Sequence, residues 1–387
     1  RRAAAEPSRV TRSLLALADG TAEAALATCY PEPRPLILKL PDPAPLNSLP
    51  PDAQPHRSAA TRQQPASRKE AAPMNNHRIT TPFDAQSTAA EVIAGIDLTD
   101  RRAIVTGGAS GIGIETARAL ASADAEVTLA VRNLEAGQRA AEDIIASTGN
   151  KQVLVAPLDL SDQASVAAFV ANWAGPLHIL VNNAGIMATP EMRTPQGWEM
   201  QFATNHLGHF TLTTGLHHAL AAADGARVVS VSSVGHINGE VLFDDIHFQR
   251  HPYEPWAAYS QSKTANILFA VEASKRWAAD RITVNALNPG RIPGTNLSRH
   301  IGDVPNAPAS FEPNSTGVSW KNPEQGAATS VLLASSPLLE GFGGHYFEDC
   351  NEAGPHQPGI RRGVTAYALD PEKADRLWQA SLDTLAS

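Results

Sequence analysis

The segment TGGASGIG (106–113) constrains the fold of this chain more than any other stretch. It follows a short apolar run and precedes IETARALASADA (114–125), whose apolar residues recur at helical spacing. Gly107, Gly111 and Gly113 allow backbone conformations and close approaches that a Cβ would block. The free N–H groups at the start of the following helix suit a pyrophosphate. Glycines alone often serve turns, so the position between strand and helix is what predicts a phosphate-binding loop.

Short apolar runs alternate with helical patterns beyond Asp97. The predicted strands are 101–108 and 126–132, runs that begin at 151, 177, 226 and 281, and a last one at 343–349. The predicted helices are 114–125, 135–147, 162–174, 197–222 and 256–279. This alternation predicts βαβ units, and the unbroken apolar strands indicate burial on both faces. The predicted fold class is α/β, a doubly wound parallel sheet of the Rossmann type in a single domain.

The end of the second predicted strand bears on the choice of dinucleotide. Sites for NAD usually place an acidic side chain there, to bind the ribose 2′-hydroxyl. This chain has Val131 followed by Arg132. A guanidinium suits a 2′-phosphate, so the sequence favours NADP(H) over NAD(H). The alternative interpretation is that Arg132 is a solvated residue at a helix start.

Residues 1–73 differ in composition from the rest of the chain. They contain twelve of the 29 prolines and no extended hydrophobic period. Such a segment cannot bury enough apolar surface to offset the entropy lost on ordering, which predicts disorder. Because Met74 is the first methionine, we expect 1–73 to be a non-native extension. A transit peptide is the alternative, which the prolines and seven acidic residues disfavour.

The remaining sequence divides into three parts. Residues 74–94 lead into a catalytic NADP-binding domain over 95–350, and 351–387 form a tail with a short helix near 371–385.

The net charge of −8 gives no reason to expect nucleic acid or an anionic membrane as a partner. No apolar stretch reaches the roughly 18 residues of a membrane span. With only two cysteines, Cys29 and Cys350, the composition fits a reducing cytoplasm.

Tyr259 and Lys263 lie four residues apart in a predicted helix, and therefore on one face of it. Together with four other motifs, this pair makes the sequence resemble the short-chain dehydrogenase/reductase family. The motifs occur in the family's order over about residues 100–300, and the details resemble the branch of retinol dehydrogenases and their bacterial relatives. They are TGGASGIG, NNAG (182–185), SS (232–233), YSQSK (259–263) and NPG (288–290).

The resemblance implies a role for four residues. Tyr259 would be the general acid/base at the substrate oxygen, and Lys263 would lower the pKa of its phenol and bind the nicotinamide ribose. Ser233 would hydrogen-bond the substrate oxygen. Ser232 is the alternative, although strand alternation points the two serines to opposite faces. Asn205 would help to hold a water that relays protons to the lysine; a polar residue at a helix kink is the alternative.

The resemblance also implies a set of contacts to the cofactor. Asp159 would lie near adenine, although it could equally cap the next helix. The amide and glycine residues of NNAG would line the ribose side, and the NPG turn would lie under the nicotinamide. Besides Tyr259, Lys263 and Arg132, the expected contacts are Gly107, Ser110, Gly111, Ile112, Gly113, Asp159, Leu160, Asn183, Ala184, Gly185, Pro289, Gly290, Ile292 and Thr295.

The predicted function is hydride transfer between NADP(H) and an alcohol/carbonyl pair on a small to medium substrate. Segment 291–320, with Ile292, Val304, Phe311 and Trp320, suggests a moderately apolar one. Two alternatives stay open: a nucleotide sensor or scaffold without turnover, and reduction of a carbon–carbon double bond. A homo-oligomer is expected only from the family, through helices near 200–222 and 256–279.

Some chemically suggestive residues are expected to have no catalytic role. The thirteen histidines lack cysteine or carboxylate partners at ligand spacing, so we expect no metal. We expect His236 and His247, which lie between Ser233 and Tyr259, to be in a surface loop; contact with the substrate is the alternative. Cys350 is expected to be a passive thiol, and Trp256 is the tryptophan most suited to line the substrate pocket.

Overall fold

Eight strands form one sheet in the computed structural model, which describes residues 78–300 and 315–387. All neighbouring strands are parallel except the last pair, and the order is β3-β2-β1-β4-β5-β6-β7-β8. The strands are β1 Arg102–Thr106, β2 Glu126–Val131, β3 Val153–Pro157, β4 Ile179–Asn182, β5 Arg227–Val231, β6 Thr283–Asn288, β7 Tyr346–Glu348 and β8 Asn351–Glu352. The predicted doubly wound parallel sheet is confirmed. The predictions for 1–73, Val304 and Phe311 lie outside the described residues.

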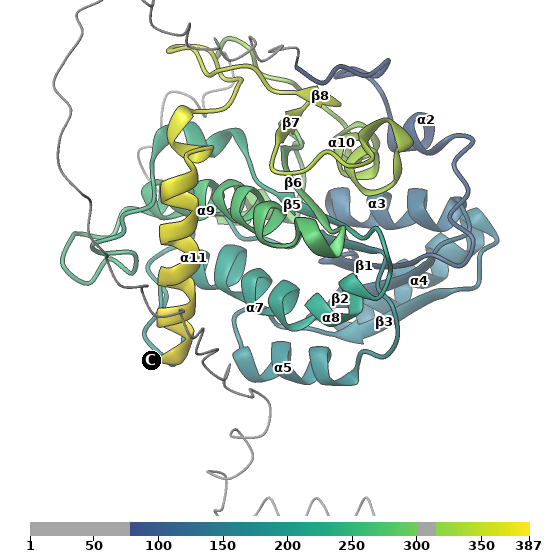
Figure 1. Cartoon of the computed structure of the whole chain (residues 1–387), viewed down its shortest axis with the longest axis horizontal. Coiled ribbons are helices and arrows are strands. Elements are labelled where there is room, and N and C mark those ends of the chain that lie inside the picture. The colour runs from purple at the N-terminus through teal and green to yellow at the C-terminus, as the bar shows by residue number, and fades with distance from the viewer. Residues whose placement is uncertain (1–77, 301–314) are drawn as a thin grey trace, which may run out of the picture. The chain divides into compact units, whose positions relative to one another are not determined.

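Helices cover both faces of this sheet (Figure 1). One face packs against α3, α4 and α10, with α2 beside them, and the other against α5, α7 and α9. The C-terminal helix α11 packs against α9. These helices are α2 Ala89–Ile93, α3 Gly111–Ser122, α4 Leu134–Thr148, α5 Gln163–Asn172, α7 Gly208–Gly215, α9 Pro255–Arg276, α10 Pro323–Ser335 and α11 Pro371–Ala386.

The strand order reverses direction between β1 and β4, which are neighbours in the sheet. In open α/β sheets this switch point leaves a crevice beyond the carboxyl ends of the strands. Thr106 ends β1 and Asn182 ends β4, and each is followed by one of the predicted cofactor motifs. The topology therefore brings motifs that are about 75 residues apart to the same edge of the sheet.

The prediction of a single helix over 197–222 is wrong, because the structure has four separate helical segments there. Helix α6 (Met200–Phe202) leads into a π-helical turn, Ala203–Leu207, before α7 and α8 (His217–Ala221). In the π turn the Gly208 N–H donates to the carbonyl of Ala203, five residues back. Such turns often occur at functional sites. The apolar pattern is compatible with either geometry, so the sequence did not reveal the break.

Two helices in the described part of the chain were not predicted, α2 and α10. Helix α10 begins with a capping box between Asn322 and Gln325, with Pro323 in its first turn. Its residues from Gly326 to Ala334 are all buried. A helix that is buried on every side shows no amphipathic period, which explains why the pattern was missed. Within the described ranges, no helix has both the length and the apolarity needed to cross a bilayer.

Candidate active site

The loop between β1 and α3 has the geometry of a phosphate-binding turn. Gly107 and Gly111 have φ of +65° and +58°, which L side chains rarely adopt. A Cβ on Gly113 would lie 2.5 Å from Asn183 Nδ2 and 2.6 Å from the Gly107 carbonyl oxygen. The third glycine is therefore needed for close packing, and the first two for the turn.

The first turn of α3 is open toward this loop. The helix has twelve residues, and Ser110, at its N-cap, makes no capping hydrogen bond through its side chain. The N–H groups of the first turn have no partner within an α-helix and carry the positive end of its dipole. A pyrophosphate held here by backbone N–H groups fits both the glycine turn and the helix end.

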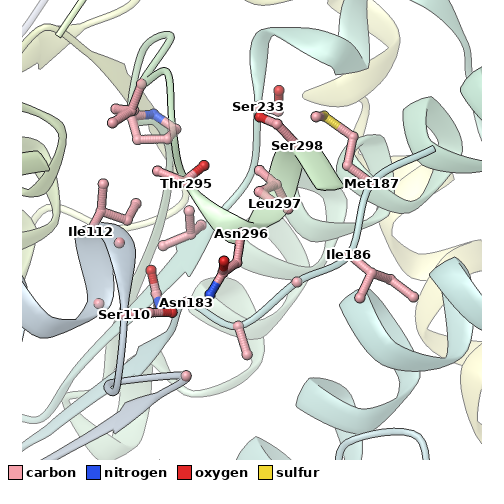
Figure 2. A pocket seen from close by; sticks show the side chains of 18 of the residues that line it. Ser110, Ile112, Asn183, Ile186, Met187, Ser233, Thr295, Asn296, Leu297 and Ser298 are labelled. Carbon is pink, nitrogen blue, oxygen red and sulfur yellow. The ribbon is translucent and has the colours of Figure 1, made fainter. Parts of the chain in front are cut away.

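A cavity of about 880 Å³ extends from this loop past the ends of the strands. Figure 2 shows Ser110, Ile112 and Asn183 on one side of it and Ser233 and Met187 on the other, with Thr295, Asn296 and Leu297 between them. Every expected cofactor contact lines this cavity, as do Ser233, Tyr259 and Lys263. Asn205 is not among the lining residues. A volume of this size accommodates an extended ligand.

The two serines at the end of β5 have different surroundings. The Ser232 hydroxyl is buried and donates to the backbone carbonyl of Lys263 at 2.7 Å, which ties β5 to α9. The Ser233 hydroxyl accepts the N–H of Gly235 at 3.0 Å and hydrogen-bonds the Tyr259 hydroxyl. Of the two, only Ser233 is bonded to the tyrosine, as strand alternation suggested.

The electrostatics of Tyr259 differ from the expectation. The residue is only 1% exposed, and burial raises the pKa of its phenol to about 12. The hydroxyl of Ser233 and the charge of Arg361 lower this pKa, but the effect of burial is larger. The expected net lowering of the phenol pKa is therefore wrong for this geometry. The phenol is protonated at neutral pH and can donate a proton.

Lys263 is buried beneath the tyrosine ring. Its Nζ donates to the Val231 carbonyl at 3.1 Å and lies 5.8 Å from the centroid of the Tyr259 ring. Burial lowers the pKa of Lys263 to about 8. A lysine with this pKa is mostly charged at pH 7 and loses its proton at a lower pH than an exposed lysine.

Asn205 lies in the π turn, behind the cavity wall. Its Oδ1 accepts the Ile186 N–H at 2.9 Å, and its Nδ2 donates to the Ile186 carbonyl at 2.9 Å and to Ser262 Oγ at 3.0 Å. A Cβ on Gly185 would lie 3.2 Å from Asn205 Oδ1 and 3.5 Å from Lys263 Nζ. Asn205 and Lys263 thus approach the same glycine, and the asparagine side chain fixes the loop after NNAG.

His209, a buried histidine that the sequence analysis did not single out as functional, links Asn205 to the ends of β1 and β4. His209 Nδ1 lies 2.9 Å from the Asn205 carbonyl, which can only accept, so this nitrogen carries the proton. Its Nε2 then accepts from the Thr106 hydroxyl at 2.9 Å. Thr106 Oγ1 in turn accepts the N–H groups of Asn183 and Ala184. Burial lowers the pKa of His209 to about 4, which keeps the ring neutral in this network.

Local geometry decides between the two interpretations of Asp159 and gives the position of Arg132. Asp159 does not cap α5, because the cap is Asp162, whose carboxylate accepts the Ala164 N–H at 3.0 Å. Asp159 instead accepts from Ser161 and lines the cavity. Arg132 is exposed, just before the Asn133 cap of α4, and it also lines the cavity.

Several other expectations can be compared with the structure. Trp256 lines the cavity, as predicted. His236 is completely buried and contacts Tyr346, so its assignment to a surface loop is wrong. Cys350 is buried against Thr329, in keeping with a passive thiol. Within the described ranges, no group of three or more potential ligands is placed to hold a metal ion.

The sequence analysis missed three cationic residues of the cavity, Arg291, Arg299 and Arg361. Arg291 lies directly after NPG, and its guanidinium lies 4.7 Å from the centroid of the Trp320 ring. Arg361 lies more than 100 residues beyond Tyr259, in the segment expected to be a tail, and no local motif marks it. Only the tertiary fold brings it to the cavity.

Comparison with known proteins identifies the family. The short chain dehydrogenase model matches residues 101–305. A protein of Streptomyces lividans named "Probable oxidoreductase" is 55% identical over 302 residues, covering 76% of this chain and 100% of the relative. The chain therefore belongs to the short-chain dehydrogenase family, as its motifs predicted, and it is an NAD(P)-dependent oxidoreductase.

Further relatives agree with the predicted branch and fold. Human retinol dehydrogenase 11 is 37% identical over 302 residues, covering 75% of this chain and 87% of the relative. A solved structure of an uncharacterized protein from Mycobacterium paratuberculosis superimposes with a TM-score of 0.60 at 34% identity, covering 78% of this chain and 98% of that one. The NADP complex of Pseudomonas aeruginosa RhlG superimposes with a TM-score of 0.51 at 29% identity, covering 65% of this chain and 95% of that one.

Proposed function

We propose that this protein interconverts an alcohol and a carbonyl with NADP(H), through Ser233, Tyr259, Lys263 and Asn205. The observation that carries the proposal is the hydrogen bond between Ser233 and Tyr259 in a cavity that is continuous with the glycine loop. Two hydroxyls on one wall can hold a single carbonyl oxygen. A relative of similar fold, RhlG, binds NADP.

The proposed chemistry divides between cofactor and protein. A bound nicotinamide would supply or accept the hydride. Ser233 donates a hydrogen bond to the substrate oxygen, which stabilises the charge that develops there. Tyr259, protonated at neutral pH, delivers the proton to that oxygen in the direction of reduction. Lys263, whose Nζ lies 5.8 Å from the centroid of the Tyr259 ring, would take part in the relay that restores the proton of the phenol.

The test is NADPH oxidation, followed at 340 nm, with a panel of aldehydes and ketones and identification of the products. Alcohol formation is the expected result. NADPH binding without turnover of any carbonyl would favour a sensor or scaffold. Saturation of an enone with its carbonyl left intact would instead identify a carbon–carbon double-bond reductase.

The preference for NADP(H) rests on Arg132 and has its own test. Arg132→Gln should lower the ratio of the affinities for NADPH and NADH by about 10-fold or more, because a charge-assisted contact contributes about 1.5–3 kcal/mol. The measurement is titration of both reduced cofactors by fluorescence. Arg139→Gln is the matched control, since Arg139 lies on α4, the helix that follows Arg132, pairs with Glu135 and is absent from the cavity wall. An unchanged ratio in Arg132→Gln would reject the assignment.

We further propose a cytoplasmic protein that acts on a small to medium, moderately apolar substrate and, from the family resemblance, forms a homo-oligomer. Met187, Trp256 and Leu297 provide apolar surface beside Tyr259. Light scattering of the purified protein tests the oligomeric state.

A further inference from the structure

His236 is a buried side chain close to the proposed catalytic serine, and the chemistry above does not use it. Ser233 is the N-cap of the 3₁₀ turn η3 (Val234–Asn238), which contains His236, and the Ser233 hydroxyl accepts the N–H of Gly235 in that turn. His236 is 0% exposed and is not among the described residues of the cavity wall. It therefore does not touch a ligand in the cavity and can act on the reaction only through its neighbours.

The imidazole of His236 has a hydrogen-bond partner on each ring nitrogen. Nδ1 lies 2.7 Å from the Ser233 carbonyl oxygen, and Nε2 lies 3.4 Å from the backbone nitrogen of Thr365. The carbonyl can only accept and the amide can only donate, so the proton is on Nδ1 and Nε2 accepts. The other tautomer would place two acceptors against each other at 2.7 Å. Burial lowers the pKa of His236 to about 4, which keeps the ring neutral at pH 7.

His236 holds the Ser233 carbonyl with two hydrogen bonds. The ring Nδ1–H donates to it at 2.7 Å, and the His236 backbone N–H donates to it at 3.2 Å. This carbonyl belongs to the peptide unit that follows Ser233, so its direction fixes the turn whose Gly235 N–H bonds the serine hydroxyl. Any residue at position 236 except proline can make the backbone bond, whereas the ring bond is specific to the side chain.

The far side of the imidazole is held by a segment near the C-terminus. The Val364 carbonyl accepts the His356 N–H at 2.8 Å, and the same peptide unit carries the Thr365 N–H that donates to Nε2. Tyr346 of β7 packs edge-on against the ring with the centroids 5.0 Å apart, and its hydroxyl lies 3.5 Å from Nδ1. The ring is therefore fixed between the serine turn and the chain beyond β8.

We propose that His236 is a positioning residue for Ser233. Its Nδ1–H holds the peptide unit after the serine so that the hydroxyl meets the substrate oxygen, and the Thr365 N–H selects the tautomer that can make this bond. This inference rests on the proposed carbonyl reduction through Ser233. The rival role is that of a core histidine that fills space, which would affect the stability of the protein and not the reaction.

Two substitutions separate the ring nitrogens. In His236→Asn the side-chain amide can take the place of Nδ1 and keep the bond to Ser233. In His236→Gln the amide takes the place of Nε2, so the bond to Ser233 is lost. With NADPH and benzaldehyde, kcat of the full-length protein should fall about 10- to 100-fold in His236→Gln and stay within about 3-fold in His236→Asn, because a displaced donor stabilises the transition state less. Thermal unfolding should show similar destabilisation of both variants, and the affinity for NADPH should stay within about 3-fold.

A second readout is the dependence on the serine hydroxyl. If His236 acts through this hydroxyl, His236→Gln should change kcat by less than about 2-fold when Ser233→Ala has already removed it. Tyr367→Phe is the matched control, because Tyr367 bonds the backbone carbonyl of His236 and not its ring. It should destabilise the protein and leave kcat unchanged. Equal losses of kcat in His236→Asn and His236→Gln, or an undiminished loss in the Ser233→Ala background, would overturn the proposal.

Two measurements without turnover decide the inference if the wild type reduces neither benzaldehyde nor any other carbonyl, which would refute the proposed function separately. ¹⁵N NMR of histidine-labelled wild type, with His236→Asn to identify the signal, should show a proton on Nδ1 and none on Nε2. A proton on Nε2 rejects the inference, and this measurement also serves if His236→Gln does not fold. Amide exchange over 234–238 should be faster in His236→Gln than in His236→Asn, and equal rates reject the positioning role.

Discussion

Tyr259→Phe is expected to lower kcat for carbonyl reduction by about 10²- to 10⁴-fold, the usual contribution of a positioned general acid. The substitution removes one hydroxyl from a side chain that is otherwise buried and packed against Met187 and Trp256. The ring and the cavity shape are preserved, so the affinity for NADPH should stay within about 3-fold of the wild type. Steady-state kinetics and fluorescence titration of NADPH measure the two quantities separately.

Tyr367→Phe is the matched control for this substitution. Its hydroxyl donates to the His236 carbonyl at 2.6 Å, and Tyr367 is not among the cavity residues. Loss of that bond should reduce the free energy of unfolding by about 0.5–1.5 kcal/mol without changing kcat. Undiminished activity of Tyr259→Phe would remove the proposed mechanism.

Gly113→Ala is expected to weaken NADPH binding by about 10- to 100-fold. The added methyl would lie 2.5 Å from Asn183 Nδ2 and 2.6 Å from the Gly107 carbonyl oxygen, so the glycine loop or the NNAG segment must move. Overpacking of this kind typically costs about 1–3 kcal/mol, which is a factor of about 10 to 100 if it falls on the bound loop geometry. Fluorescence titration of NADPH measures the affinity, and thermal unfolding reports the accompanying loss of stability.

Gly149→Ala separates this steric effect from backbone strain. Gly149 has φ of +80° at the end of α4, and a Cβ there would have no atom within 4 Å. This variant should lose about 1 kcal/mol of stability from the left-handed conformation and keep its affinity for NADPH. If both variants bound NADPH like the wild type, Gly113 would be a packing residue without influence on the cofactor site.

The sequence predicted those parts of the site that lie in local motifs. The glycine loop needs three residues with small or absent side chains within one turn, and Tyr259 and Lys263 need only one helical face. Both requirements involve only a few neighbouring positions, so they appear in the sequence as short motifs. The alternation of strands and helices predicted the sheet for the same reason.

The remaining features depend on contacts between distant segments. Arg361 reaches the cavity because its backbone bonds to Thr316, which no local pattern indicates. The pKa of Tyr259 was predicted with the wrong sign because spacing alone does not reveal burial. His209 was set aside with the other histidines, although its two ring nitrogens connect Asn205 to Thr106.

The C-terminal helix changes what α9 can offer to another subunit. Trp378 of α11 stacks on Phe269 of α9 with an interplanar angle of 4°, and Arg276 bonds to Asp375 at 2.7 Å. The flank of α9 that α11 covers is thus satisfied within a single chain. Pairing of two subunits through that particular flank of α9 would therefore require α11 to move away from it.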